Sequence, residues 1–110
     1  MGGGMQPQGH TQIIVNMVDY GLGLKAAGDA ARWRHEGSTE PTSTQTSGVG
    51  TLHLENGIPE DVRTALKAMG YRLGRSDGGF GGYQAIMRDL KTGVYFGASE
   101  MRKDGSAIGY

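Results

Sequence analysis

The sequence of 110 residues contains no cysteine, which excludes disulfide bonds, thiolate nucleophiles and cysteine-ligated zinc. The compartment stays undetermined, because exported proteins without cysteine are common. The chain also has no net charge, with 11 Lys plus Arg against 11 Asp plus Glu, so no net field attracts nucleic acid or an anionic membrane. We therefore expect neither nucleic acid nor a membrane as a partner.

Long hydrophobic runs are missing as well. No apolar stretch approaches the roughly 18 residues of a membrane span, and no charged region followed by an apolar one opens the chain. We therefore expect a soluble chain without a targeting signal. Glycine, in contrast, is abundant: 21 residues, nearly a fifth of the chain against a usual share of about 7%. This composition favours short strands, hairpins and many turns, and the length predicts one domain over residues 1–110 with one modest core.

Periodicity indicates where regular structure lies. Apolar residues between positions 8 and 20 follow helical spacing, although the run Ile13-Ile14-Val15 also suits a buried strand. A short helix is expected at 24–31, followed by extended chain at 32–35. Strands are expected at 51–55 and 71–73, a hairpin joins 83–88 to 93–98 through the loop 89–92, and 99–110 is expected to lie over the surface as a tail.

The helix expected at 59–69 has the clearest signals of the chain. Pro59 stands at its start and Gly70 directly after its end. An apolar stripe that we expect to be buried consists of Val62, Ala65, Leu66 and Met69. Residues 36–48, in contrast, contain no hydrophobic side chain, so we expect a flexible surface loop there.

The candidate chemistry is sparse. The three histidines, His10, His35 and His53, lack metal-ligand spacing, and the glycine loop 77–82 lacks the Lys-Ser/Thr of a phosphate loop. We expect no metal and no cofactor, and a solvated charge pair between Arg102 and Asp104. Gly2-Gly3-Gly4 before the first helix places amide N–H groups at the positive end of a helix dipole, although such a start is also typical of a flexible leader.

Several ordered blocks of the sequence together resemble one family. Met5-Gln6-Pro7-Gln8-Gly9-His10 follows the diglycine, and the later blocks are Asp19-Tyr20-Gly21-Leu22, Asp29-Ala30-Ala31-Arg32-Trp33, Leu52-His53-Leu54-Glu55, Phe80-Gly81-Gly82-Tyr83-Gln84 and Gly97-Ala98-Ser99 through to Gly109-Tyr110. In this order they are similar to the C-terminal part of the small subunit of the γ-glutamyltransferase (γ-glutamyltranspeptidase) family. The resemblance covers almost the whole chain.

This resemblance implies an α+β fold: part of the αββα sandwich of N-terminal-nucleophile hydrolases, with two or three helices packed on a small, mainly antiparallel sheet. It also implies γ-glutamyl transfer or hydrolysis of glutathione-like amides by a threonine nucleophile that this chain does not contain. By position, Gly2 and Gly3 match the paired glycines whose backbone amides form the family's oxyanion hole.

The sequence also departs from the family pattern. Met1 and Ala31 replace prolines, Gly4 replaces an aspartate or serine, and Glu100-Met101 replaces Asp-Pro. These changes favour a divergent, acylase-like branch with a different amide substrate as one alternative. A second is a non-catalytic relic that pairs with another copy of itself. In the main reading the partner is the upstream portion of the same enzyme, and the isolated chain is inactive.

Overall fold

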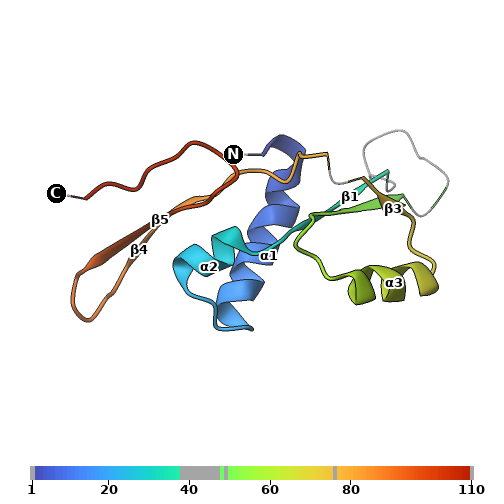
Figure 1. The fold of residues 1–110 in the computed structure, drawn as a ribbon. Helices are drawn as coiled ribbons and strands as arrows, with labels where there is room; N and C mark the ends of the chain where they lie inside the picture. The colour runs from blue at the N-terminus through green and yellow to red at the C-terminus, as the bar shows by residue number, and fades with distance from the viewer. Residues whose placement is uncertain (1, 38–47, 49, 76, 110) are drawn as a thin grey trace. The chain divides into compact units, whose positions relative to one another are not determined.

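The computed structural model describes residues 2–37, 48, 50–75 and 77–109. Helices and strands alternate with irregular segments in the order η1, α1, α2, β1, β2, α3, β3, β4, β5, which confirms the α+β class (Figure 1). The strands fall into a three-stranded and a two-stranded sheet instead of one sheet. The contacts divide the chain into two compact units, residues 1–30 with 81–110 and residues 31–80. The expectation of one domain over residues 1–110 stays a prediction.

The first unit begins with a helix. A short 3-10 helix, η1 (Gly3–Met5), runs directly into α1 (Gln6–Val18). Pro7 stands in the first turn of α1, where its missing N–H leaves no helical hydrogen bond unmade. The helical prediction is confirmed and the strand alternative is wrong, because Ile13 is buried while its neighbour Ile14 is 54% exposed, as one face of a helix requires.

The second helix, α2 (Leu24–Asp29), is shorter than expected because Ala30 leaves the helical region with ψ at 139°. It packs on both α1 and the hairpin (Figure 1). The hairpin itself is confirmed: β4 (Gln84–Arg88) pairs antiparallel with β5 (Tyr95–Ser99), from Gln84 opposite Ser99 to Arg88 opposite Tyr95. Residues 101–109 form no helix or strand, as expected for the tail.

The core of this unit is small. It consists of Ile13 from α1, Ala27 from α2, Ala98 from β5 and Tyr83, which stands just before β4. Met17, Leu24 and Ala85 pack against it. Small residues on α2 and β5 let the helix approach the hairpin closely, and Tyr83 fills the space between them.

The second unit contains a three-stranded sheet. β1 (Trp33–Glu36) and β2 (Thr51–Leu54) are antiparallel, and β3 (Leu73–Gly74) lies parallel to β2. The parallel pair needs a crossover, and α3 (Glu60–Ala68) supplies it. Leu54 is 2% exposed and is the main apolar anchor of β2. The strand predictions at 51–55 and 71–73 are confirmed in place, although β3 is only two residues long and begins at Leu73.

The prediction of a buried stripe on α3 is wrong. No residue of this helix is buried, and Val62 and Met69 are 43% and 73% exposed. The start and stop signals are correct: Pro59 is the N-cap, and the Gly70 N–H closes the helix on the Lys67 carbonyl at 3.0 Å, with φ of Gly70 at 93°. The apolar spacing therefore predicted the helix correctly, but the stripe is not buried against other described residues.

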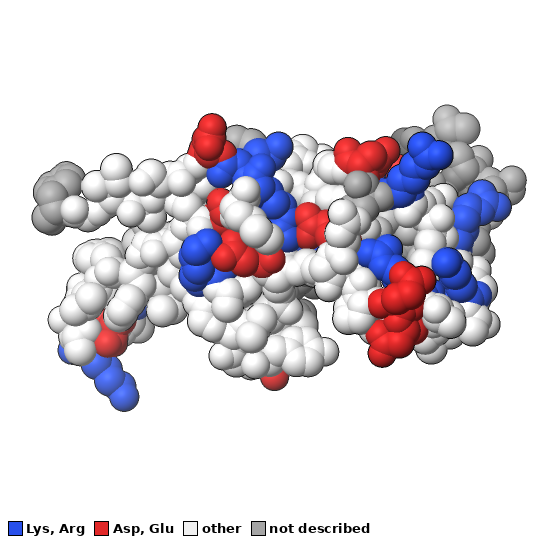
Figure 2. Space-filling view, in the orientation of Figure 1, with Lys and Arg blue, Asp and Glu red and all other residues white. Residues whose placement is uncertain are grey.

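Charge on the described surface is unevenly distributed. On the face drawn in Figure 2, charged side chains gather over α3 and over the segment after β5, while the hairpin is mostly uncharged except near its loop. The loop expected at 36–48 lies largely outside the described residues. Within the part that the structure describes, no helix is long and apolar enough to cross a membrane.

Candidate oxyanion turn and the contacts that hold it

The diglycine predicted as a site forms the first turn of the N-terminal helix. The Gly2 carbonyl accepts the Met5 N–H at 2.9 Å, and the Gly3 carbonyl accepts the Gln6 N–H. Both carbonyls are therefore used by the helix. The amides at a helix start have no partner within the helix, and neither the Gly2 nor the Gly3 N–H donates to another described residue. Their place before α1 puts both residues at the positive end of the helix dipole.

Both positions require glycine. Gly2 has φ 152° and ψ 1°, and Gly3 has φ 51°, in the left-handed region that side chains disfavour. A Cβ on Gly2 would lie 3.3 Å from the Gly81 Cα, so the two backbones touch. Met5, 5% exposed, holds the other end of the turn in the protein interior. The turn therefore has a defined place in the structure, and its oxyanion role remains a prediction.

Tyr83 is a contact point that the sequence did not single out. Its ring lies against Gly28 of α2, where a Cβ would be 2.3 Å from the ring Cδ1. Its hydroxyl donates to the Leu24 carbonyl at 3.1 Å, and its own carbonyl accepts the Glu100 N–H at 3.4 Å. Tyr83 therefore links α2, the start of β4 and the end of β5. The only sequence signal was its place directly after the glycines 81 and 82.

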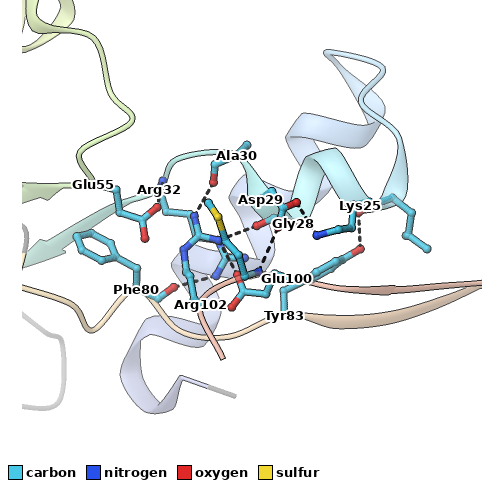
Figure 3. Close-up of polar contacts among 12 residues, drawn as sticks. Lys25, Gly28, Asp29, Ala30, Arg32, Glu55, Phe80, Tyr83, Glu100 and Arg102 are labelled. Carbon is cyan, nitrogen blue, oxygen red and sulfur yellow. Dashed lines mark hydrogen bonds and ion pairs between the residues drawn. The ribbon is translucent and has the colours of Figure 1, made fainter. Parts of the chain in front are cut away.

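Arg102 holds the segment after β5 against the end of α2 (Figure 3). Its guanidinium donates to the carbonyls of Gly28 and Ala30, both at 2.8 Å, and to the buried carboxylate of Glu100 at 2.5 Å. The predicted solvated pair with Asp104 is wrong, since the Arg102 side chain is only 12% exposed and Glu100 is its carboxylate partner. A cation beside the last carbonyls of a helix also complements its dipole.

Asp29 completes this cluster. Its carboxylate accepts from the Lys25 ammonium at 2.6 Å and from the Met101 N–H at 3.3 Å. The hydrogen bond from Lys25, with the Lys25 charge, the Met101 N–H and the Arg102 charge, lowers the pKa of Asp29 below its ordinary value of 3.8. The carboxylate is therefore ionised at neutral pH and ties the segment after β5 to α2 a second time.

A hollow of about 480 Å³ lies in the same unit. Its lining includes His10, Gly82, Tyr83, Lys103 and Asp104. Gly2 and Gly3 do not line this hollow. This hollow is therefore not in contact with the candidate oxyanion donors.

The histidines do not converge. His10 lines the hollow, His35 is in β1, and the His53 ring nitrogens lie 3.1 Å from Glu36 and 2.9 Å from the Arg75 carbonyl. In the described ranges, no group of three His, Asp or Glu side chains could hold a metal ion. Thr11, the neighbour of His10, donates its hydroxyl to the Pro7 carbonyl, four residues back on its own helix.

Comparison with known proteins gives the family. A family model described as γ-glutamyltranspeptidase matches residues 1–110. The glutathione hydrolase proenzyme of Bacillus subtilis is 31% identical over 98 residues, and the acylase ACY 1 proenzyme of a Pseudomonas species is 36% identical over 97. These matches cover 89% and 88% of this chain, but 15% of each relative.

A solved structure agrees with the sequence relatives. Cephalosporin acylase from Bacillus halodurans superposes with a TM-score of 0.78 at 38% identity, covering 100% of this chain and 19% of that one. The small sheets and their helices are accordingly part of the layered fold of N-terminal-nucleophile hydrolases. The chain spans less than a fifth of the length of these three relatives. It belongs to the γ-glutamyltranspeptidase family and corresponds to one part of its longer members.

Proposed function

We propose that this chain is the segment of a γ-glutamyltranspeptidase-like enzyme that supplies the oxyanion hole through the amide N–H groups of Gly2 and Gly3. The observation that carries the proposal is their geometry. Both stand at the start of a helix of the family's sequence pattern, their carbonyls accept helical hydrogen bonds, and their N–H groups donate to no other described residue. The nucleophile, a threonine hydroxyl in the family this chain resembles, comes from outside these 110 residues.

The reaction would proceed by acyl transfer. The hydroxyl oxygen attacks the amide carbonyl carbon of the donor while its proton passes to a base, and the carbonyl oxygen becomes an oxyanion. The Gly2 and Gly3 N–H groups donate to that oxygen, and the helix dipole adds a favourable field. The tetrahedral intermediate collapses by expelling the protonated amine, and water or an amino acid then takes the acyl group.

Two classes of acyl donor are candidates for the substrate. The glutathione hydrolase relative favours a γ-glutamyl amide, whereas the acylase relatives have the higher sequence identity, at 36% and 38% against 31%. The replacements at Met1 and Gly4, directly beside the proposed donors, favour a change at the acyl site. Hydrolysis of another amide is therefore the second candidate, and a donor panel of γ-glutamyl and acyl anilides on the complete enzyme separates the two.

The role of the proposed N–H donors can be tested by deleting a single N–H group. In the complete enzyme, replacing Gly3 by glycolic acid converts its amide to an ester, which deletes the N–H and keeps the chain geometry. We expect a fall in kcat of about 10²- to 10³-fold with little change in KM, because one oxyanion donor is lost.

Gly4 provides the matched control. The same replacement there deletes an N–H one residue further along η1. It also makes the Gly3 carbonyl a weaker hydrogen-bond acceptor, as the ester at Gly3 does to the Gly2 carbonyl. Each of these carbonyls accepts one helical hydrogen bond, so the two variants are matched in this respect. Equal rates for the two ester variants would contradict the assignment of the Gly3 N–H.

A further inference from the structure

The proposed oxyanion turn rests on another glycine turn: Gly2 contacts Gly81, 79 residues further along the chain. The Gly81 Cα lies 3.3 Å from the position that a Cβ on Gly2 would take, so no side chain separates the two backbones. Gly81 itself has φ 78°, in the left-handed region. The place of the Gly2 peptide is therefore set, on this side, by main-chain atoms of Gly81 and not by an adjustable side chain.

Gly81 is held in turn by its neighbours. A Cβ on Gly82 would lie 2.8 Å from the Lys103 Cγ, so the segment after β5 covers this turn. Tyr83, 8% exposed, fixes the other end through its ring contact with Gly28 and its hydrogen bond to the Leu24 carbonyl. The support thus runs from α2 through Tyr83 to Gly81 and from there to Gly2.

We infer that Gly81 is a positioning residue for the oxyanion turn: its backbone fixes where the Gly2 and Gly3 N–H groups point. This inference rests on the proposed function of those amides. A non-glycine residue at 81 relieves its strain by changing φ, which moves the Cα on which Gly2 rests. Displacements of about 1 Å in a reacting constellation lower rates by as much as 10²-fold, whereas substrate binding depends on other contacts.

The test compares Gly81→Ala with Gly93→Ala in the complete enzyme. Gly93 has φ 76°, nearly the same as Gly81, but lies in the hairpin loop with no atom within 4 Å of an added Cβ. Both variants place alanine at nearly the same positive φ, but only Gly81 contacts the proposed oxyanion turn. We expect Gly81→Ala to lower kcat at least 10-fold at unchanged KM and to weaken by a similar factor the binding of a boronic acid that forms a tetrahedral adduct with the nucleophile. Gly93→Ala should change neither.

Equal kcat and equal boronate affinity for the two variants would overturn the inference. If Gly81→Ala does not fold, Tyr83→Phe takes its place, because it removes only the hydroxyl that bonds to Leu24: a lower kcat at unchanged KM supports the inference, and an unchanged kcat overturns it. The Gly3 ester variant separates this outcome from failure of the proposed function. If the ester variant loses rate while Gly81→Ala keeps the full rate, only the positioning role of Gly81 is rejected.

Discussion

Gly28 and Tyr83 show how a single missing side chain shapes this unit. Tyr83 reaches the Leu24 carbonyl only because Gly28, one helical turn later, leaves room for the ring. We predict that Gly28→Ala destabilises the protein by about 1 to 3 kcal/mol, although alanine favours helices, because its methyl group would overlap a buried ring. Urea unfolding measures the change.

Gly9 is the matched control for this prediction. It is also a buried glycine in a helix, but the nearest atom to an added Cβ is the Met5 Cε at 4.0 Å, an ordinary contact. Gly9→Ala should therefore be neutral or stabilise by up to about 1 kcal/mol through helix propensity alone. A loss of stability as large as that of Gly28→Ala would show that glycine is needed in these helices for another reason.

Arg102 should contribute more to stability than its exposed neighbours do. Arg102→Ala removes two hydrogen bonds to helix carbonyls and the ion partner of buried Glu100, so we predict a loss of about 3 to 5 kcal/mol. The double variant Arg102→Met with Glu100→Gln should lose clearly less, since no buried carboxylate then loses its cation. Lys91→Ala, in the exposed hairpin loop, is the control and should stay within about 0.5 kcal/mol. Equal losses for the single and double variants would argue against the ion pair.

The sequence predicted the candidate residues Gly2 and Gly3 but not what holds them. A glycine run before a helix is visible locally, and the resemblance to a family gave it a role. The contacts of Arg102 with Gly28 and Ala30 join residues 74 and 72 positions apart, and no periodicity encodes such pairs. Glu100 and Asp104 both stand two positions from Arg102, so sequence distance could not choose between them. Glu100 is the partner because its carboxylate is buried beside the guanidinium.

Among the elements, the loop between β4 and β5 is stabilised by a single carboxylate, that of Asp89. Asp89 accepts from the Lys91 N–H at 2.8 Å and the Thr92 hydroxyl at 2.7 Å. The Thr92 hydroxyl and then the backbone N–H groups lower the pKa of Asp89 below its ordinary value of 3.8. Because the folded pKa is depressed, the stabilisation is complete well above pH 3.8 and is lost as pH falls below that value through the folded pKa.

We predict that Asp89→Asn lowers the melting temperature at pH 7, and that its difference from the wild type shrinks toward pH 2 as Asp89 becomes protonated. Thermal unfolding at a series of pH values measures this. Thr92→Val should show a smaller difference of the same sign, since one of the hydrogen bonds remains. A difference that grows on acidification would mean that the loop does not stabilise the ionised carboxylate.

Elements whose signals are local were predicted best. The hairpin and α3 have turn or cap residues at both ends, and both are found in place. The division of the strands into two sheets and the parallel pairing of β3 depend on contacts between distant segments, which no local pattern contains. The apolar stripe of α3 correctly predicted a helix, but burial requires a partner surface, and the described residues do not provide one.

At the scale of the whole molecule, many apolar side chains remain exposed. On the hairpin these include Ile86 at 77%, Leu90 at 87% and Tyr95 at 66%. An apolar hollow of about 360 Å³ between α1 and β4 adds to this surface. Exposed apolar side chains that form a contiguous patch typically mark an interface. Since the chain corresponds to 15 to 19% of its relatives, we expect the remainder of the enzyme to cover this surface.

The most direct measurement of the central claim is turnover of a chromogenic γ-glutamyl anilide, and of an acyl anilide in parallel, by two samples. One is the isolated chain, and the other is the chain joined to the remaining part of the enzyme, as found in its longer relatives. On the proposed function, the isolated chain supplies oxyanion donors but no nucleophile, so we predict no turnover by it. We predict turnover by the joined protein that falls at least 10²-fold when the Gly3 N–H is deleted. Turnover by the isolated chain, or a joined protein indifferent to that deletion, would contradict the account.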